Sequence, residues 1–365
     1  MKNKLFTLAL CMTALVFTNC SSDDDNTPSQ PINIVIEGAA VAPTVGGPNQ
    51  QNQVYVDLST NTTTSVQRDS WDLGFYSGTE FRVAINGSIE MTVAELTTND
   101  IDNVNASTQE VLDLQPQMEI GNPGTDLFVD NPEGDISGTA ISEVSSTDDN
   151  NKVYLVNLGY EVGTETPPVG SISVSGDSRG WKKIRILKNG NDYILQYADL
   201  DATTHNEVTI SKQADYNFTF FSFNTETEIN IEPEKTKWDL NFSRATQILS
   251  FGPGISGAYG YSDYVLNNTK SNATVYSIDT EVDTDLSYDN FTLADVIDTN
   301  FTNDQRGIGS SWRNGGGPGA LPSLKDNVFY VVNDTDGNLY KLKFIALTNA
   351  AGERGYPEFV YSLLQ

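Results

Sequence analysis

Apolar and polar residues alternate with a period of two in several short runs along the chain. Short runs of this kind, bounded by Gly, Asn, Asp and Ser, are typical of β-strands with one buried face. In the run 192–200, Tyr193, Leu195 and Tyr197 share one face, whereas 216–223 has aromatic residues on both faces and predicts a central strand. Further strands are predicted at 32–36, 54–58, 81–85, 153–158, 181–187, 207–211, 248–251, 273–278, 328–332, 339–347 and 358–364.

Turn sequences and helical periodicity complete the prediction of fold class. Asn189-Gly190 suits a type I′ hairpin turn, and Asp336-Gly337 marks a second hairpin. Helical periodicity is scarce, and 291–299 is the best candidate for a short helix because its apolar residues form a stripe. The sequence therefore predicts an all-β protein with antiparallel sheets, hairpins and little helix.

The pattern Trp-Asp-Leu-x-Phe occurs twice, at 71–75 and at 238–242. One interpretation is that two strands of a single core need the same large anchor. The other is a weak repeat of two half-domains, one around each motif. We favour the first, because five positions are too few to establish a repeat.

The first twenty residues predict export and a lipid anchor. Lys2 and Lys4 precede an apolar run at 5–17, which is too short to span a membrane and has the length of a signal-peptide core. Cys20 follows, so we expect cleavage before Cys20 and lipidation of its thiol, for example with palmitate. Asn19 departs from the small residue that usually precedes such a cysteine, and an ordinary signal peptide is the alternative.

The expected organisation is a signal peptide at 1–19, a flexible tether at 20–31 and one all-β domain at 32–365. The polar residues after Cys20 resemble tethers that carry lipoproteins to the cell surface in Bacteroidetes-type bacteria. We therefore expect the protein in the outer membrane, exposed at the cell surface and attached to the membrane only through its lipid.

Cysteine count and charge narrow the possible functions. The two cysteines are Cys11, inside the signal peptide, and Cys20. The mature chain is therefore expected to have no disulfide and no thiolate nucleophile. The net charge is −28, from 21 Lys and Arg against 49 Asp and Glu. Such a surface repels phosphate backbones, which makes nucleic acid a poor candidate partner, and we interpret the charge as an aid to solubility.

The C-terminal stretch 326–364 resembles the end of HmuY-family domains. The resemblance lies in the hairpin turn 334–338, in YKLKF at 340–344 and in GERGYPEF at 352–359. Further similar stretches are SWDLGFYSGTEFRVAING (70–87), LQYADLD (195–201), KWDLNFS (237–243), AYGYSDYVLNN (258–268) and IGSSWR (308–313). The resemblance covers roughly 50–365, and none of its motifs is catalytic.

The resemblance implies an all-β fold with long hairpins and a non-enzymatic, haem-binding surface lipoprotein. Haem-binding members clamp haem between hairpin loops with two axial side chains, paired His in some and Met in others. They take haem from haemoproteins and pass it to a TonB-dependent outer-membrane receptor. The implied cofactor here is haem (iron protoporphyrin IX), and the implied function is haem scavenging. The alternative is a surface lipoprotein that binds a glycan or a protein partner without haem ligation.

Few side chains of the mature chain suit haem iron, which takes nitrogen or soft sulfur ligands. His205 is the only histidine, and Met91 and Met118 are the only methionines outside the signal peptide. Two-sided ligation must therefore use two of these three, unless a tyrosine contributes. Met91 alternates with Ile89 and Val93 like a core residue, and His205 sits where a solvated hairpin tip is expected. Met118 lies in a polar, loop-like stretch, so packing in a core explains its presence least well of the three.

Haem propionates favour Lys or Arg, and Lys182 and Arg185 are the candidates within the one basic cluster of the chain. The alternative is a basic strand edge that guards against aggregation. Hydrolase chemistry is disfavoured because His205 is the only possible triad base and no G-x-S-x-G motif occurs. Composition leaves a glycosidase open, but no local pattern singles out a carboxylate pair. We expect no enzymatic activity.

Overall fold

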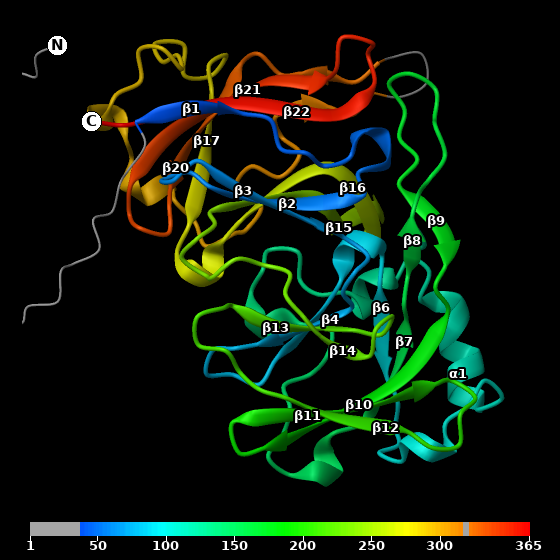
Figure 1. The fold of residues 1–365 in the computed structure, drawn as a ribbon. Helices are drawn as coiled ribbons and strands as arrows, with labels where there is room; N and C mark the ends of the chain where they lie inside the picture. Colours follow the sequence, from blue (N-terminus) through cyan, green and yellow to red (C-terminus); the bar gives the residue numbers. More distant parts are fainter. Residues whose placement is uncertain (1–36, 317–320) are drawn as a thin grey trace, which may run out of the picture. The chain divides into compact units, whose positions relative to one another are not determined.

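The computed structural model describes residues 37–316 and 321–365, and β-strands joined by turns dominate them (Figure 1). The predicted signal peptide, the tether, Cys20 and the predicted strand at 32–36 lie outside the described residues. Within the described part, no helix is long and apolar enough to cross a bilayer. The single described α-helix is α1 (Gln109–Leu114).

Two five-stranded antiparallel sheets occur among the described residues, with the orders β12-β11-β10-β7-β6 and β1-β22-β21-β20-β17 (Figure 1). The first consists of β6 (Thr92–Glu95), β7 (Val153–Asn157), β10 (Trp181–Asn189), β11 (Asp192–Asp199) and β12 (Asn206–Ile210). The second consists of β1 (Gly38–Val41), β17 (Thr274–Asp279), β20 (Val328–Asn333), β21 (Leu339–Thr348) and β22 (Arg354–Leu363).

Two four-stranded sheets have the orders β14-β13-β4-β5 and β16-β15-β2-β3. Their strands are β2 (Asn52–Asp57), β3 (Thr62–Gln67), β4 (Leu73–Tyr76), β5 (Val83–Ile85), β13 (Phe218–Ser222), β14 (Thr227–Ile229), β15 (Leu240–Gly252) and β16 (Ile255–Asn267). Two short ladders join β8 (Tyr160–Val162) to β9 (Ser175–Ser178) and β18 (Arg313–Asn314) to β19 (Ser323–Leu324). The predicted all-β, antiparallel fold class is confirmed.

The chain passes through the same order of elements twice. Residues 38–199, the first half, run from β1 through the hairpins β2–β3 and β4–β5 to β6, β7, β10 and β11. Residues 206–363, the second half, run from β12 through β13–β14 and β15–β16 to β17, β20, β21 and β22. The leading strand and first hairpin of each half pair with the other half: β1 with β22, β2 with β15, β12 with β11 and β13 with β4. Neither half therefore completes its sheets alone.

Local predictions from the sequence have mixed outcomes. The central strand at 216–223 is confirmed, because β13 lies between β14 and β4. The hairpin between β10 and β11 is also confirmed, but its turn type was wrong. Asn189 pairs with Asp192, so the loop is Gly190-Asn191, and only Gly190 has a positive φ, 62°. That pattern is typical of a type II′ turn.

The predicted helix at 291–299 was wrong. The segment forms two three-residue 3₁₀ turns, Leu293–Asp295 and Asp298–Asn300. Phe291 is buried against Phe329, with ring centroids 5.4 Å apart, whereas Leu293 is exposed. The apolar residues therefore do not form the continuous buried stripe that stabilises an amphipathic helix.

The aspartates of the two Trp-Asp-Leu motifs are buried and make matching hydrogen bonds across the halves. Asp72 Oδ2 accepts from the Phe223 amide at 2.6 Å, and the Asp72 amide donates to the Phe221 carbonyl at 2.9 Å. Asp239 Oδ2 accepts from the Leu58 amide at 2.8 Å, and its own amide donates to the Val56 carbonyl at 2.8 Å. Each motif thus fixes the end of the hairpin strand that the other half contributes.

Two asparagines complete the matching networks. Asn86 Nδ2 donates to the Trp71 carbonyl at 2.8 Å, and Asn268 Nδ2 donates to the Trp238 carbonyl at 3.0 Å. The Asn86 amide donates to the Asp72 carbonyl at 3.0 Å, and the Asn268 amide donates to the Asp239 carbonyl at 2.9 Å. Both asparagines are buried. In both motifs, a buried asparagine therefore hydrogen-bonds to the backbone carbonyls of the Trp and the Asp residue.

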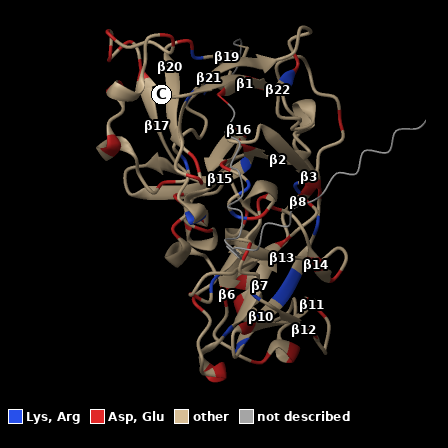
Figure 2. Cartoon of the chain, turned by 60° about the vertical axis from the view of Figure 1, so that its left-hand side comes forward, with Lys and Arg blue, Asp and Glu red and all other residues tan. Residues whose placement is uncertain are grey.

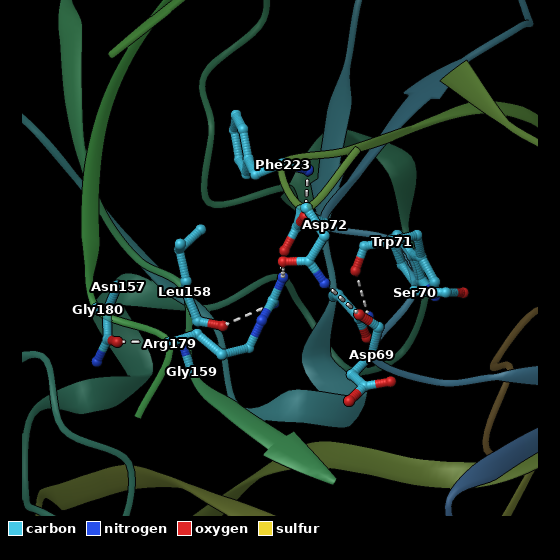
Figure 3. Close-up of polar contacts among 12 residues, drawn as sticks. Asp69, Ser70, Trp71, Asp72, Asn157, Leu158, Gly159, Arg179, Gly180 and Phe223 are labelled. Atoms are coloured by element: carbon cyan, nitrogen blue, oxygen red, sulfur yellow. Dashed lines mark hydrogen bonds and ion pairs between the residues drawn. The ribbon is translucent and has the colours of Figure 1, made fainter. Parts of the chain in front are cut away.

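The two motif aspartates differ in one partner. Figure 3 shows Arg179 reaching Asp72, and Arg179 Nη1 lies 2.6 Å from Asp72 Oδ1 with both side chains buried. Asp239 has no such cation within residues 37–316 and 321–365, and it accepts instead from the Thr335 amide at 2.9 Å. Burial raises the pKa of Asp239 to about 7 and also raises the pKa of Asp72, which Arg179 opposes.

We expect Asp72→Asn to destabilise the protein more than Asp239→Asn. The first change leaves Arg179 buried without its counter-charge, at a cost of about 3–5 kcal/mol. The second removes a carboxylate that is already partly protonated near pH 7, at a cost of about 1–3 kcal/mol. Urea unfolding at pH 7 measures both. The double variant Asp72→Asn, Arg179→Met should recover part of the lost free energy of unfolding. An Asp239→Asn loss equal to or larger than that of Asp72→Asn contradicts the role given to the Arg179–Asp72 pair.

Candidate ligand-binding site

A cavity of about 220 Å³ lies where the two halves meet, and we call it the inter-half cavity. Its aromatic wall includes Trp71 and Trp238, the first residues of the two motifs. Trp238 packs edge-to-face on Tyr55 of β2, with centroids 5.0 Å apart, and Trp71 packs the same way on Phe220 of β13 at 4.8 Å. The exchanged hairpins therefore bring an aromatic ring of the opposite half to each motif tryptophan.

Strand β15 supplies part of the polar wall. Asn241 and Ser243 line the cavity, whereas the alternate residues Leu240 and Phe242 belong to the buried apolar cluster of the second half. This alternation follows from the period of two in a strand. Because β15 is covered on both faces, its polar side chains lie inside the protein rather than in solvent.

Five polar atoms on residues that line the cavity are buried and have no hydrogen-bond partner among the described residues. They are Nε1 of Trp71, Nε1 of Trp238, Oδ1 of Asn241, Oγ of Ser243 and Nε of Arg244. A buried polar group without a partner costs about 1–3 kcal/mol. Each of the five atoms has an exposed area below 1 Å², so none of them is open to a molecule in the cavity.

Three further lining residues are titratable: Glu232 is buried, and Asp130 and Lys270 are partly buried. Burial raises the pKa of Glu232 to about 8 and that of Asp130 to about 6, and it lowers the pKa of Lys270 to about 8. Glu232 Oε1 accepts from the Phe218 amide at 2.8 Å, and Lys270 Nζ donates to the Gly134 carbonyl at 2.6 Å. Glu232 is therefore largely neutral at pH 7, whereas Asp130 and Lys270 are largely charged.

The two predicted methionines pack against opposite faces of β6. Met91 and Val93 pack into one apolar cluster, whereas Met118 packs with Ala94 in another. Both methionine side chains are 0 % exposed. Thr92 Oγ1 donates to the Met118 carbonyl at 2.8 Å from the second face.

Of the two, only Met91 lines the inter-half cavity. Its amide donates to the Asn86 carbonyl, just as the Ala273 amide donates to the Asn268 carbonyl. The matching position in the second half is thus a small apolar residue, which is consistent with the core-filling interpretation of Met91. Met118 lies in a loop after the 3₁₀ turn Gln115–Gln117, as its polar surroundings suggested, but its side chain is buried.

His205 lies in the turn between β11 and β12, where a hairpin tip was predicted. Its Nδ1 lies 2.9 Å from Asp102 Oδ1, and the side chain is partly exposed. His205 does not line the inter-half cavity. The structure therefore does not bring His205 together with Met91 at that cavity.

Lys182 and Arg185 already have partners. Lys182 Nζ lies 2.6 Å from Asp199 Oδ1, and Arg185 donates to the carbonyls of Asn151 and Asp148 at 3.0 and 2.8 Å. Their strand, β10, lies in the middle of its sheet, so the alternative of a basic strand edge was wrong. Strand order cannot be read from composition, which explains the error.

These placements do not fit two-sided ligation of haem iron. Such a site needs two ligands that face the iron from opposite sides. Met91 and Met118 are buried in different apolar clusters, and His205 lies in a turn between two strands. Among the described residues, no group of three or more His, Cys, Asp or Glu is arranged to hold a metal ion. The assignment of these residues as iron ligands stays a prediction that the titration below tests.

Sequence reasoning singled out the two motif tryptophans but missed most of the cavity. The cations at its wall are Arg244 and Lys270, and Arg244 Nη2 lies 2.6 Å from Glu90 Oε1. The sequence signal that could have indicated the cavity is the set of polar residues in β15, such as Asn241 and Ser243, which follow the buried Asp239 of the motif. Acidic residues elsewhere are spread over many loops rather than gathered at one element (Figure 2).

Glu232 gives stability a pH dependence that can be isolated. Its folded pKa of about 8 lies above the unfolded value, so the folded state holds the proton longer and loses stability as pH rises from about 4.5 to 8. We expect Glu232→Gln to gain about 2–4 kcal/mol relative to the native protein between pH 5 and pH 8. Urea unfolding at both pH values measures this. Glu234→Gln, an exposed neighbour, is the control, and a Glu232→Gln difference that stays constant with pH contradicts the prediction.

The HmuY protein family model matches two successive segments, residues 49–200 and 214–361, and each contains one Trp-Asp-Leu motif. Comparison with curated proteins gives no match. Apo PinO from Porphyromonas gingivitis is 10% identical, with 90% of this chain and 98% of that chain covered and a TM-score of 0.26. The apo HmuY analog from Tannerella forsythia is 11% identical, with 91% and 98% covered and a TM-score of 0.24.

A third solved structure, named as a lipoprotein and from Bacteroides fragilis NCTC 9343, is 11% identical, with 91% of both chains covered and a TM-score of 0.20. TM-scores this low support no conclusion about shape or ligand. The family model is the informative match, because its two segments together span most of the chain. This protein belongs to the HmuY family.

Proposed function

We propose that this protein is a non-enzymatic, lipid-anchored surface protein that binds an extracellular ligand in the inter-half cavity. The observation that carries the proposal is the aromatic-walled cavity of about 220 Å³ where the two halves meet. Binding sites typically combine an apolar wall with a few placed polar groups, which is the arrangement found here. The anchor at Cys20 and the location at the outer-membrane surface rest on the sequence.

Haem scavenging is the second candidate, and family membership favours it. In this form of the proposal, the protein takes haem from haemoproteins and passes it to a TonB-dependent outer-membrane receptor. Met91 is the one predicted iron ligand that lies beside the inter-half cavity. The separation of Met91 from Met118 and His205 weighs against two-sided ligation, so we place haem second.

Haemin titration of purified residues 21–365 separates the two candidates. If the ligand is not haem, haemin should produce no saturable, sharp Soret band, because two axial ligands cannot meet the iron from opposite sides. The spectra of Met91→Leu, Met118→Leu and His205→Ala should then match that of the native chain. Leucine removes the sulfur and nearly preserves side-chain volume, so that loss of folding does not obscure the result.

A saturable one-to-one Soret band that shifts in any one of these variants would contradict the first proposal. It would identify the shifted residue as an iron ligand and establish haem as the ligand. Circular dichroism of each variant checks that the β-sheet signal is retained.

A further inference from the structure

We infer that the outer edge of β3 is a docking surface for an extended strand of another protein, which joins the sheet beside β3. The partner strand is uncharged in its middle and flanked by basic residues. Three observations carry the inference: the free backbone of this edge, the lack of the features that protect edge strands, and the net charge of the chain. It does not depend on ligand binding in the inter-half cavity.

Strand β3 has a neighbouring strand on one side only. It stands at the end of the sheet order β16-β15-β2-β3, and its ladder with β2 runs without a register shift from Thr62 to Gln67. Every second residue of such a strand points its N–H and C=O groups away from the neighbour. Apart from β2, no described residue hydrogen-bonds to the backbone of 62–66. The edge therefore presents a row of groups that another extended backbone matches in register.

The side chains of β3 leave this edge accessible. Residues 62–65, three threonines and a serine, are exposed. Val66 is partly buried, because it packs against the cluster that contains Tyr55 and Phe220. A strand beside β3 would continue this face of the sheet, so we expect small apolar side chains on the face that it shares with Val66 and polar side chains on the other face.

The matching edge of the other half is protected, whereas β3 is not. Soluble proteins protect an edge strand by shortening it or by placing a charge, a proline or a bulge on it. Strand β14 has three residues, carries Glu228 and directly follows Glu226. Strand β3 has six residues, and the stretch 58–67 contains no charged residue and no proline. Because β3 and β14 hold the same position in their hairpins, the fold alone does not require an unprotected edge.

The net charge argues for a basic partner and against a second copy of the chain. Two copies with a net charge of −28 each repel one another. Two paired edges would also bury much less surface than the about 1,200–2,000 Å² of a stable protein–protein interface. A strand flanked by Lys or Arg is instead attracted to the acidic chain, while its uncharged middle lies beside the uncharged β3.

The test is an NMR titration of isotope-labelled residues 21–365 with a capped peptide of alternating threonine and valine that has lysine at both ends. We expect saturable shifts and slower hydrogen exchange at the amides of β3, but not at those of β14. A matched peptide carries N-methyl groups on the backbone nitrogens that would face β3, so it keeps every side chain and loses these donors. It should bind about 10- to 100-fold more weakly.

Two matched variants locate the site. Thr64→Lys places a charge on β3, as Glu228 does on β14, and should weaken binding of the lysine-flanked peptide about 3- to 10-fold by like-charge repulsion. Thr227→Lys adds the same charge to β14 and should leave the affinity unchanged. Both positions are exposed, so both variants should fold, which circular dichroism checks. Equal weakening by the two variants would overturn the assignment to β3.

Other results would also overturn the inference, each for a different reason. Without shifts at β3, no docking surface exists there, and equal binding of the N-methylated peptide means that backbone pairing is not involved. Slow exchange of the β3 amides without any peptide means that the edge is already covered. A dimer in analytical ultracentrifugation that Thr64→Lys dissociates identifies a second copy as the occupant. Tighter binding of the same peptide with glutamate at both ends excludes a basic partner.

Discussion

The fold depends on two buried aspartates that bond across the halves. A carboxylate taken out of water needs strong hydrogen bonds, and Asp72 and Asp239 find them in backbone amides of the opposite half, at Phe223 and Leu58. Each bond fixes the end of an exchanged hairpin. The register of β13 against β4 and of β2 against β15 follows from that fixed end. If either aspartate lost these partners, the hairpin of the other half would lose its anchor.

The inter-half cavity is a consequence of this exchange. Because each hairpin crosses to the other half, Tyr55 and Phe220 arrive beside tryptophans that lie far from them in sequence. The neighbouring Asn241 and Ser243 line the same cavity. Among the described residues, Asn241 Oδ1 and Ser243 Oγ are buried without hydrogen-bond partners. Such groups lower stability, so this part of the scaffold is not optimised for folding alone.

The sequence predicted what depends on local pattern and missed what depends on long-range pairing. Strands and hairpins follow from alternation and from turn residues such as Gly190 and Gly337, so they were found. The exchange of β2 and β13 was not, because strand partners far apart leave no local signal. Met118 illustrates the same limit: its polar neighbours predicted a loop, but tertiary contacts bury it in an apolar cluster. The division of 32–365 into two half-domains stays a prediction, because the exchanged strands leave neither half complete.

The residues that carry the family resemblance support the scaffold rather than a ligand. Asp263, within one such stretch, accepts from Arg354 Nε at 2.5 Å and pairs with Arg313 at 3.4 Å, and these two arginines lie in two further stretches of the second half. Trp312 stacks on Phe344 at 4.2 Å. A Cβ at Gly355 would meet the Gly47 carbonyl oxygen at 2.0 Å, so only glycine fits that position. Because these motifs fix strands and not iron, a chain can keep all of them while its ligand changes, and family membership alone therefore does not decide which ligand is bound.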